Sequence, residues 1–208
     1  SVHYSDYVQK VAILVTKAPH CLYDLLVRQQ EGELPCEIPL IISNRPALEH
    51  IADKFRIPFV CLPVAPETKI KQEEEMRKLL RQYRVDVLVM ARYMQVLSKE
   101  LVEEYGGRII NIHHAFLPAF QGASPYQQAH ERGVKMIGAT AHYATAELDD
   151  GPIIEQDVER VNHEHTIEEL SRIGSDIERI VLARAVKSHL EQRIIISGKR
   201  TVVFSTGV

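Results

Sequence analysis

The sequence contains little cysteine and no strong excess of either charge. Its three cysteines are scattered over 208 residues and form no CxxC pair, which favours reduced thiols in a cytosol over a disulfide framework. The formal net charge is −3, so nothing indicates a general attraction to nucleic acid or to an anionic membrane. No uninterrupted apolar run approaches the length of a membrane span. We therefore expect a cytoplasmic protein that binds neither nucleic acid nor membranes.

Two kinds of cofactor motif are also missing. No GxGxxG pattern follows an apolar run, which argues against a dinucleotide site. The 10 histidines show no HxxxH spacing, and the adjacent His113 and His114 would face opposite sides of a strand, where they could not easily share an ion. Cys21 beside His20 suggests a thiol nucleophile, although a small apolar residue at the start of a helix is the reading we favour. We expect no metal and no bound cofactor.

What the sequence does contain is a regular alternation of apolar runs and amphipathic stretches. Hydrophobic residues make up 45% of the chain and charged residues 25%, ordinary values for a globular domain. Strand-like runs occupy residues 11–16, 38–43, 59–64 and 85–91, and helical patterns occupy residues 21–30, 47–55, 69–83 and 98–105. The charged helix at 69–83 is predicted to be exposed. This pattern predicts an α/β fold with a doubly wound, mostly parallel central sheet and helices on both faces.

The second half of the sequence is less regular. Residues 136–143 and 152–161 are strand-like. Thr166 and Glu169 have the spacing of a capping box and predict the start of a long helix that runs towards Gln192. The apolar segments RIIIS and TVVF flank Gly198 and Lys199 and predict a C-terminal β-hairpin.

Polar side chains occur at the end of one predicted strand, in RIINIHHAFLPAFQG (108–122). Asn111 and His113 are two residues apart, so they point to the same face of the strand and His114 points to the other. An amide donor beside an imidazole can stabilise a carbonyl oxygen as it becomes negative, and imidazole can transfer a proton near neutral pH. Taken alone, the pair is better explained as a polar strand end that hydrogen-bonds a loop.

A second stretch, GATAHYATAELDDGPIIEQ (138–156), adds a carboxylate to this set. His142 lies near the end of a predicted strand, and Asp149 lies in the loop that follows. The residues around Asp149 are typical of a turn, which is the simplest explanation for them. A carboxylate there can also orient an imidazole and accept a proton from water. Asparagine, histidine and aspartate together make a plausible set for acyl transfer.

Three segments, NIHHAFLPAFQG, GATAHYATAELDDGPII and MARYMQVLS, together resemble the folate-dependent formyltransferase family. The doubled histidine, ARYMQVLS, PYQQAHERGVKMIGATAHY and the closing TVVF are similar to the formyltetrahydrofolate deformylases within that family. The resemblance runs from Lys10 to Phe204 at unchanged spacing. It implies the formyltransferase fold and hydrolysis of 10-formyltetrahydrofolate to tetrahydrofolate and formate, without a metal or a redox cofactor.

The resemblance also implies roles for particular residues. Asn111, His113 and Asp149 take the family's catalytic positions, and His142 takes a supporting position near the aspartate. Two segments hold the pterin, largely through backbone groups: Tyr93, Met94, Gln95, Val96 and Leu97, and the loop of Ala144, Thr145, Ala146 and Glu147. Ala115 and Gln121 depart from the serine and lysine expected there, but neither is a catalytic position.

By the same resemblance, the protein balances the one-carbon pool, supplies formate for purine synthesis and forms a homo-oligomer. The deformylases carry an N-terminal ACT-type regulatory domain, and the opening SVHYSDY resembles the junction after it. We therefore expect residues 1–9 to be a lead-in or linker from such a domain and residues 10–208 to form the catalytic domain.

Formyl transfer to an amine such as glycinamide ribonucleotide is the main alternative. The family's transformylases place a glycine-rich turn after the first strand, where backbone N–H groups approach a phosphate. The corresponding turn here, TKAPHCL (16–22), contains no glycine, and Pro19 has no N–H to offer. This favours water as the acceptor. A non-catalytic folate-binding module is a further alternative, and the presence of Asn111, His113 and Asp149 argues against it.

Overall fold

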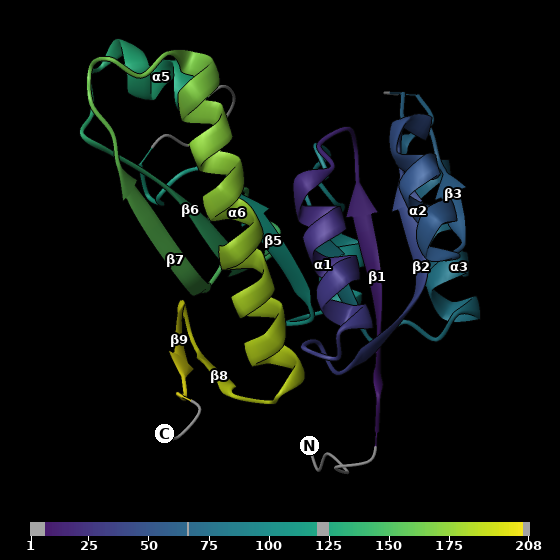
Figure 1. Cartoon of the computed structure of the whole chain (residues 1–208). Coiled ribbons are helices and arrows are strands. Elements are labelled where there is room, and N and C mark those ends of the chain that lie inside the picture. Colours follow the sequence, from purple (N-terminus) through teal and green to yellow (C-terminus); the bar gives the residue numbers. More distant parts are fainter. Residues whose placement is uncertain (1–6, 66, 120–124, 206–208) are drawn as a thin grey trace.

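The computed structural model describes residues 7–65, 67–119 and 125–205, which form a seven-stranded sheet with helices and a separate two-stranded sheet (Figure 1). The strands are β1 (Gln9–Val15), β2 (Cys36–Ser43), β3 (Phe59–Cys61), β4 (Val87–Met90), β5 (Ile109–His113), β6 (Met136–Tyr143), β7 (Ile153–Arg160), β8 (Ile194–Ser197) and β9 (Arg200–Val203). The helices are α1 (His20–Gln30), the 3-10 helix η1 (Pro46–Leu48), α2 (Glu49–Phe55), α3 (Lys69–Gln82), α4 (Lys99–Glu104), α5 (Pro125–Glu131) and α6 (Ile167–Leu190).

The large sheet has the strand order β3-β2-β1-β4-β5-β6-β7. The strands from β3 to β5 pair in parallel, while β6 and β7 run antiparallel to their neighbours. The order reverses at β1, which lies between β2 and β4, and such a point is where open α/β sheets form ligand crevices. The predicted doubly wound, mostly parallel sheet is confirmed, and so is the C-terminal hairpin of β8 and β9.

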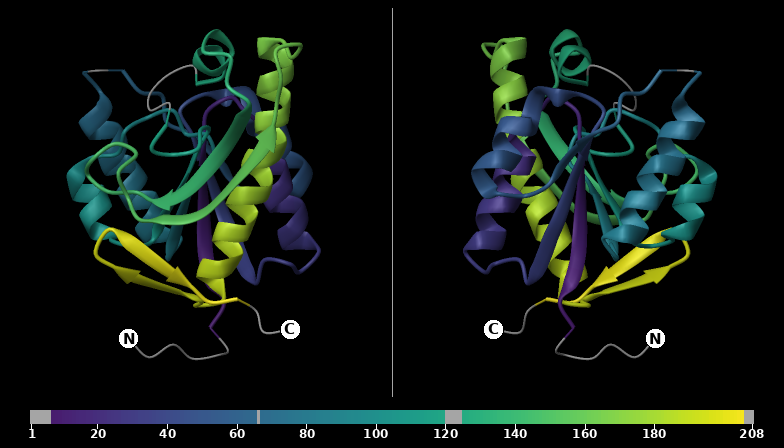
Figure 2. Two further views of the ribbon diagram at one scale, coloured as in Figure 1. Left: turned by 90° about the vertical axis from the view of Figure 1, so that its left-hand side faces the viewer. Right: turned by 90° about the vertical axis from the view of Figure 1, so that its right-hand side faces the viewer.

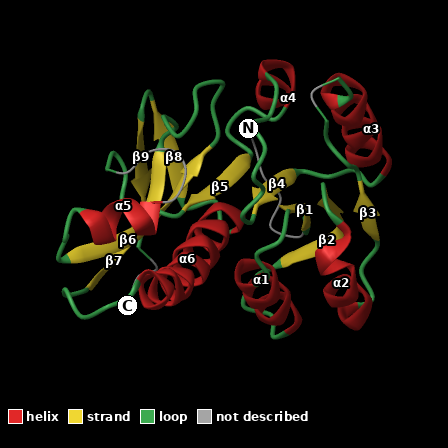
Figure 3. Cartoon of the chain, turned by 90° about the horizontal axis from the view of Figure 1, so that it is seen from above, coloured by secondary structure: helices red, strands yellow, loops and turns green. Residues whose placement is uncertain are grey.

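Helices cover both faces of the sheet. Figure 3 shows α1, α2 and α6 on one face and α3 and α4 on the other. Each face has its own buried cluster, because the parallel strands are apolar on both sides. Leu22 and Leu26 of α1 belong to the first cluster, and Met76 and Leu80 of α3 belong to the second. The β8–β9 hairpin lies at the opposite end of the molecule from α5 (Figure 2).

The predicted helix starts are confirmed at two caps. The Ser98 hydroxyl accepts a hydrogen bond from the backbone N–H of Leu101, and Thr166 and Glu169 form the complete capping box that begins α6. The sequence reasoning missed α5, whose short segment PYQQAHE lacks a clear apolar stripe. It also made β3 too long, since the strand ends at Cys61 and LPV continues as loop.

The expected apolar side of α3, with Met76 and Leu80, is buried, but the prediction that its charged and polar residues are exposed is wrong at two positions. Gln72 and Glu73 are buried, and both contact the segment that follows β4. The Gln72 side-chain amide donates to the Tyr93 hydroxyl at 3.3 Å, and the backbone N–H of Ser98 donates to the Glu73 carboxylate at 2.6 Å. A buried loop must pair its polar groups, so these two side chains face inward although their residue types suggest solvent.

Two predictions concern residues at or beyond the described ranges. The last residue of the predicted lead-in, Gln9, already pairs with Cys36 in the sheet. Residues 1–6 and Gln121 lie outside the described residues, and the origin of residues 1–9 stays a prediction. Among the described helices, none is both long and apolar enough to span a membrane.

Candidate active site

The carboxyl end of β5 opens into a cavity of about 260 Å³. Asn111 and His113 line it from β5, as predicted from their spacing. Tyr93, Met94, Gln95 and Val96 line it from the segment after β4, and Asp149 lines it from the loop between β6 and β7. The three predicted catalytic residues therefore come together at the end of a parallel strand, where ligand sites of α/β sheets lie.

A smaller cavity of about 40 Å³ continues from the first one, and Met90, Gln95, Val96, Asn111, Leu148 and Asp149 line both. Leu97, His142, Ala144, Thr145 and Glu147 complete its wall. The two predicted pterin segments thus face each other across the catalytic residues. Ala146 is the exception, since it lines a separate cavity beside the β8–β9 hairpin.

A tight turn positions Asp149. Its backbone has φ of 55°, a left-handed conformation that is uncommon outside glycine. Two residues later, Gly151 lies so close to the end of β6 that an added Cβ would collide with the carbonyl oxygen of Tyr143. The backbone N–H of Tyr143 donates to the carbonyl of Pro152 at 2.9 Å and ties the far side of the turn to the strand. Glycine at 151 therefore lets the turn hold Asp149 over the end of β5.

The Asp149 side chain is 8% exposed and faces two imidazoles. Its Oδ2 lies 3.2 Å from Nδ1 of His113, and its Oδ1 lies 3.7 Å from Nε2 of His142. Burial by itself would raise the pKa of Asp149, but the hydrogen bonds and charge interactions with His113 and His142 outweigh burial and hold that pKa well below its usual range. The residue is thus an ionised carboxylate across the neutral pH range.

An ionised carboxylate can only accept hydrogen bonds, so Nδ1 of His113 must donate to it. The other ring nitrogen, Nε2, is buried and has no hydrogen-bond partner among the described residues. His113 itself lines the catalytic cavity. The Asp149–His113 pair therefore leaves Nε2 as the atom available to a bound molecule.

The His142 ring lies beside both Asn111 and Asp149. Its Nδ1 lies 3.0 Å from the carbonyl oxygen of Tyr143, which can only accept, so Nδ1 is the donor. In the neutral ring Nε2 then accepts the Asn111 amide N–H at 3.1 Å. Only the protonated ring can donate from Nε2 to Asp149. Asn111 and His142 are also direct partners across β5 and β6. One amide hydrogen of Asn111 is used in this way, and the other stays available to a ligand.

The prediction for His114 is wrong. The residue was expected on the face opposite His113, yet it lines the same cavity and its ring centroid lies 5.3 Å from that of His113. The reason is that β5 ends at His113, so strand alternation no longer applies to the next residue. Burial and the nearby charge of Arg92 lower the pKa of His114 to about 4, which keeps this ring neutral.

Sequence reasoning also missed four other residues of the cavity wall, Met90, Arg92, Ile112 and Leu148. Arg92 belongs to the recognised segment ARYMQVLS, so its charge next to a strand end was visible. Leu148 precedes Asp149 and gave no such indication. The segment after β4 is held by the residue that follows β1, since the Thr16 hydroxyl accepts the backbone N–H of Met94 at 3.0 Å.

His20, Cys21 and Glu178 form the one group among the described residues whose ligand atoms are close enough for a metal ion, all within 4.8 Å. Nε2 of His20 already lies 2.8 Å from Glu178. Burial raises the pKa of the Cys21 thiol well above its usual value. Cys21 is fully buried near the start of α1, in line with the small apolar role favoured for it.

Comparisons with known proteins identify the family of this chain. A family model described as formyl transferase matches residues 9–186. The formyltetrahydrofolate deformylase of Synechocystis sp. is 57% identical over 204 residues, which are 98% of this chain and 72% of that protein. The chain belongs to the formyltetrahydrofolate deformylases. The recognition made from the sequence motifs is confirmed.

Among solved structures, sequence identity distinguishes the deformylases from the transformylases, whereas the fold does not. The crystal structure of a formyltetrahydrofolate deformylase from Pseudomonas syringae pv. tomato has a TM-score of 0.94 at 47% identity, and covers 97% of this chain and 67% of that one. A glycinamide ribonucleotide transformylase from Symbiobacterium toebii has a TM-score of 0.90 at 27% identity, covering 99% and 98%. The fold is shared by both groups, while the sequence is much nearer the deformylases.

Proposed function

We propose that this deformylase family member hydrolyses 10-formyltetrahydrofolate to tetrahydrofolate and formate. The observation that carries the proposal is the Asp149–His113 pair, which presents a free Nε2 beside Asn111 in a cavity at the end of β5. Identity of 57% to a protein named formyltetrahydrofolate deformylase supports the same reaction.

The substrate enters between the two segments that face each other across the site. The pterin lies in the smaller cavity, against Val96 and Leu97 on one side and Ala144 and Thr145 on the other. Backbone groups of these segments supply most of its hydrogen bonds. This placement brings the N10-formyl group to Asn111, where the two cavities meet.

Water then attacks the formyl carbon. Because the pKa of Asp149 is held low, this carboxylate is a weak base and acts on the proton through His113. His113 takes the proton of the attacking water at Nε2, and Asp149 balances the charge of the resulting imidazolium. Asn111 and the charged ring donate hydrogen bonds to the oxyanion. The carbon–N10 bond breaks as N10 takes a proton from His113, directly or through water.

Transfer of the formyl group to glycinamide ribonucleotide is the second candidate, because the transformylase fold is so similar. The turn after β1 argues against it. Pro19 precedes α1 and has no N–H, and the side chain of His20 is bonded to Glu178. Pro19 cannot contribute an amide to a phosphate site, and the turn has no glycine that would let a phosphate approach the backbone closely, so we propose water as the acceptor.

The cellular role follows from the reaction. We infer that the protein acts in the cytoplasm as a homo-oligomer, balances the one-carbon pool and supplies formate for purine synthesis. We expect no metal to be needed, since a formamide carbonyl is electrophilic once Asn111 and His113 polarise it.

Incubation of the purified protein with 10-formyltetrahydrofolate alone tests the proposal. Formate and tetrahydrofolate should appear in equal amounts with no amine present. Stable 10-formyltetrahydrofolate, consumed only after glycinamide ribonucleotide is added, would establish the transferase instead.

A further inference from the structure

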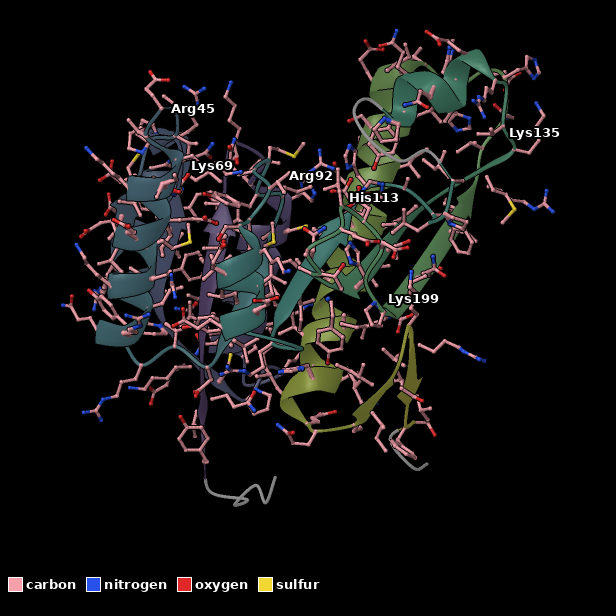
Figure 4. The ribbon with its side chains drawn as sticks, turned by 180° about the vertical axis from the view of Figure 1, so that it is seen from behind. Arg45, Lys69, Arg92, His113, Lys135 and Lys199 are labelled. Atoms are coloured by element: carbon pink, nitrogen blue, oxygen red, sulfur yellow. The ribbon has the colours of Figure 1, made fainter. Side chains whose placement is uncertain are left out.

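Arg92 is a cavity residue to which the hydrolysis described above gives no part. It follows β4, has a left-handed backbone with φ of 64°, and has a side chain that is 18% exposed. It lines the catalytic cavity together with Asn111 and His113. Figure 4 labels Arg92 and His113, which approach the site from the segments after β4 and at the end of β5.

Arg92 uses little of its hydrogen-bonding capacity within the protein. Its NH1 group donates to Oε1 of Glu178 at 3.3 Å, which is long for a hydrogen bond between charged groups. Its Nε is buried and has no partner among the described residues, as is also true of Nε2 of His113. Two buried polar nitrogens without partners thus belong to residues of one cavity. Such groups are costly to leave unpaired, which points to a polar ligand between them.

Glu178 explains how a cation is kept at this wall. The carboxylate is 1% exposed and also accepts the Tyr126 hydroxyl at 2.5 Å, while His20 lies 2.8 Å away. Burial would raise the pKa of Glu178, but His20, Arg92 and Tyr126 outweigh burial and lower it, so the group is ionised. Glu178 contacts Arg92 through the NH1 group. It therefore anchors the guanidinium while Nε of Arg92 stays unpaired.

We propose that Arg92 binds the formate product, with Nε2 of His113 as the second donor. The inference rests on the proposed hydrolysis. In that reaction the water oxygen adds to the formyl carbon, the carbon–N10 bond breaks, and N10 receives one proton. The remaining formic acid gives its proton to Nε2 of His113 and becomes formate. Guanidinium groups match the two oxygens of a planar carboxylate better than any other side chain.

The same donors act before the product forms. The tetrahedral adduct carries its negative charge on an oxygen bound to the formyl carbon, in the cavity that Arg92 and His113 line. Arg92 therefore distinguishes the anionic adduct and product from the neutral formamide of the substrate. Its removal should weaken formate binding and lower kcat, with little change in KM.

Binding of ¹³C-labelled sodium formate to the substrate-free protein, followed by NMR line broadening at constant ionic strength, tests the inference. Arg92→Met should weaken formate binding by roughly tenfold or more, in line with the loss of a hydrogen bond between charged groups. Arg92→Lys keeps the charge beside Glu178, and it should weaken binding less than Arg92→Met does. Arg45→Met, at an exposed arginine, is the matched control and should bind formate as the wild type does.

Formate affinities unchanged in folded Arg92→Met and Arg92→Lys would overturn the inference, as would equal weakening in Arg45→Met. If Arg92→Met does not fold, Arg92→Lys decides alone, and wild-type affinity in it would count against the planar contact. A wild-type protein that releases no formate from 10-formyltetrahydrofolate refutes the hydrolysis itself. That result is obtained separately from the binding titration, so the two failures can be told apart.

Discussion

Replacing Asp149 by asparagine is the sharpest test of the proposed mechanism. The amide is nearly isosteric with the carboxylate. In the wild type, Nδ1 of His113 lies 3.2 Å from Oδ2 of Asp149, and the amide oxygen of the variant can still accept this N–H. What the variant cannot do is balance a positive charge on the imidazole. Proton transfer from the attacking water should therefore fail while the geometry of the turn survives.

The expected loss in kcat is about a hundredfold or more, the size typical of removing general acid–base assistance. That corresponds to about 2.7 kcal/mol in the activation barrier. The loss in stability should be smaller. A hydrogen bond to a charged group, about 1.5–3 kcal/mol, is replaced by a neutral one of about 1 kcal/mol, so about 0.5–2 kcal/mol is lost.

Formate release, followed by coupling to a formate dehydrogenase, measures the first effect, and urea unfolding measures the second. Asp150→Asn is the matched control. Asp150 is the next residue in the same turn, but it is exposed and contacts Lys199 rather than a histidine. Turnover in Asp150→Asn should equal that of the wild type. Near wild-type turnover in folded Asp149→Asn, or an equal loss in both variants, would refute the role of the Asp149 carboxylate.

The lowered pKa of Asp149 adds a dependence on pH with a definite sign. A carboxyl whose pKa is lower in the folded state stabilises the protein above its unfolded pKa of about 3.9. This contribution is lost as the pH falls below that value towards the folded pKa. The stability difference between the wild type and Asp149→Asn should therefore be constant near neutral pH and should shrink below about pH 4.

Three further outcomes are expected. Asn111→Ala and His113→Ala should each lower kcat by a larger factor than they raise KM, because both groups act on the oxyanion; steady-state kinetics that showed a change in KM alone would reassign the residue to substrate binding. Glycinamide ribonucleotide should leave the rate of formate release unchanged and should not become formylated, as a product assay would detect, since the turn before α1 has no glycine and Pro19 has no N–H for its phosphate. Gly151→Ala should lower the free energy of unfolding by about 1–3 kcal/mol and reduce turnover, because the new Cβ meets the Tyr143 carbonyl; Gly106→Ala, whose Cβ would make only an ordinary contact, should do neither, and equal stability of the two variants would contradict the steric argument.

Much of the fold could be predicted from the sequence because its parallel strands are buried on both faces. Such strands form continuous apolar runs: the run at 38–43 lies within β2, and the run at 11–16 extends one residue beyond the end of β1. The pairing of Asn111 with His113 on one face followed from strand alternation alone. The sequence offered Asp149 only as a plausible partner of this pair, and the family resemblance assigned it a catalytic position, since the turn that carries it has no periodic pattern.

The rest of the site depends on contacts between segments that are far apart in sequence. Glu178 lies in the middle of a helix, where a glutamate ordinarily faces solvent, and its burial depends on His20, Arg92 and Tyr126 from three other segments. His114 joined the cavity because β5 ends one residue earlier than continued alternation assumes. Periodicity describes single elements, so it could not reveal either arrangement.

The cross-strand partnership of Asn111 and His142 restricts how this domain can change in length. Deleting or inserting one residue within β6 would shift the pairing with β5 and turn His142 to the other face of the sheet. The same shift would separate Thr140 from its partner His113. Insertions and deletions that preserve activity should therefore be confined to segments outside β5 and β6. The register of these two strands determines which side chains reach the site.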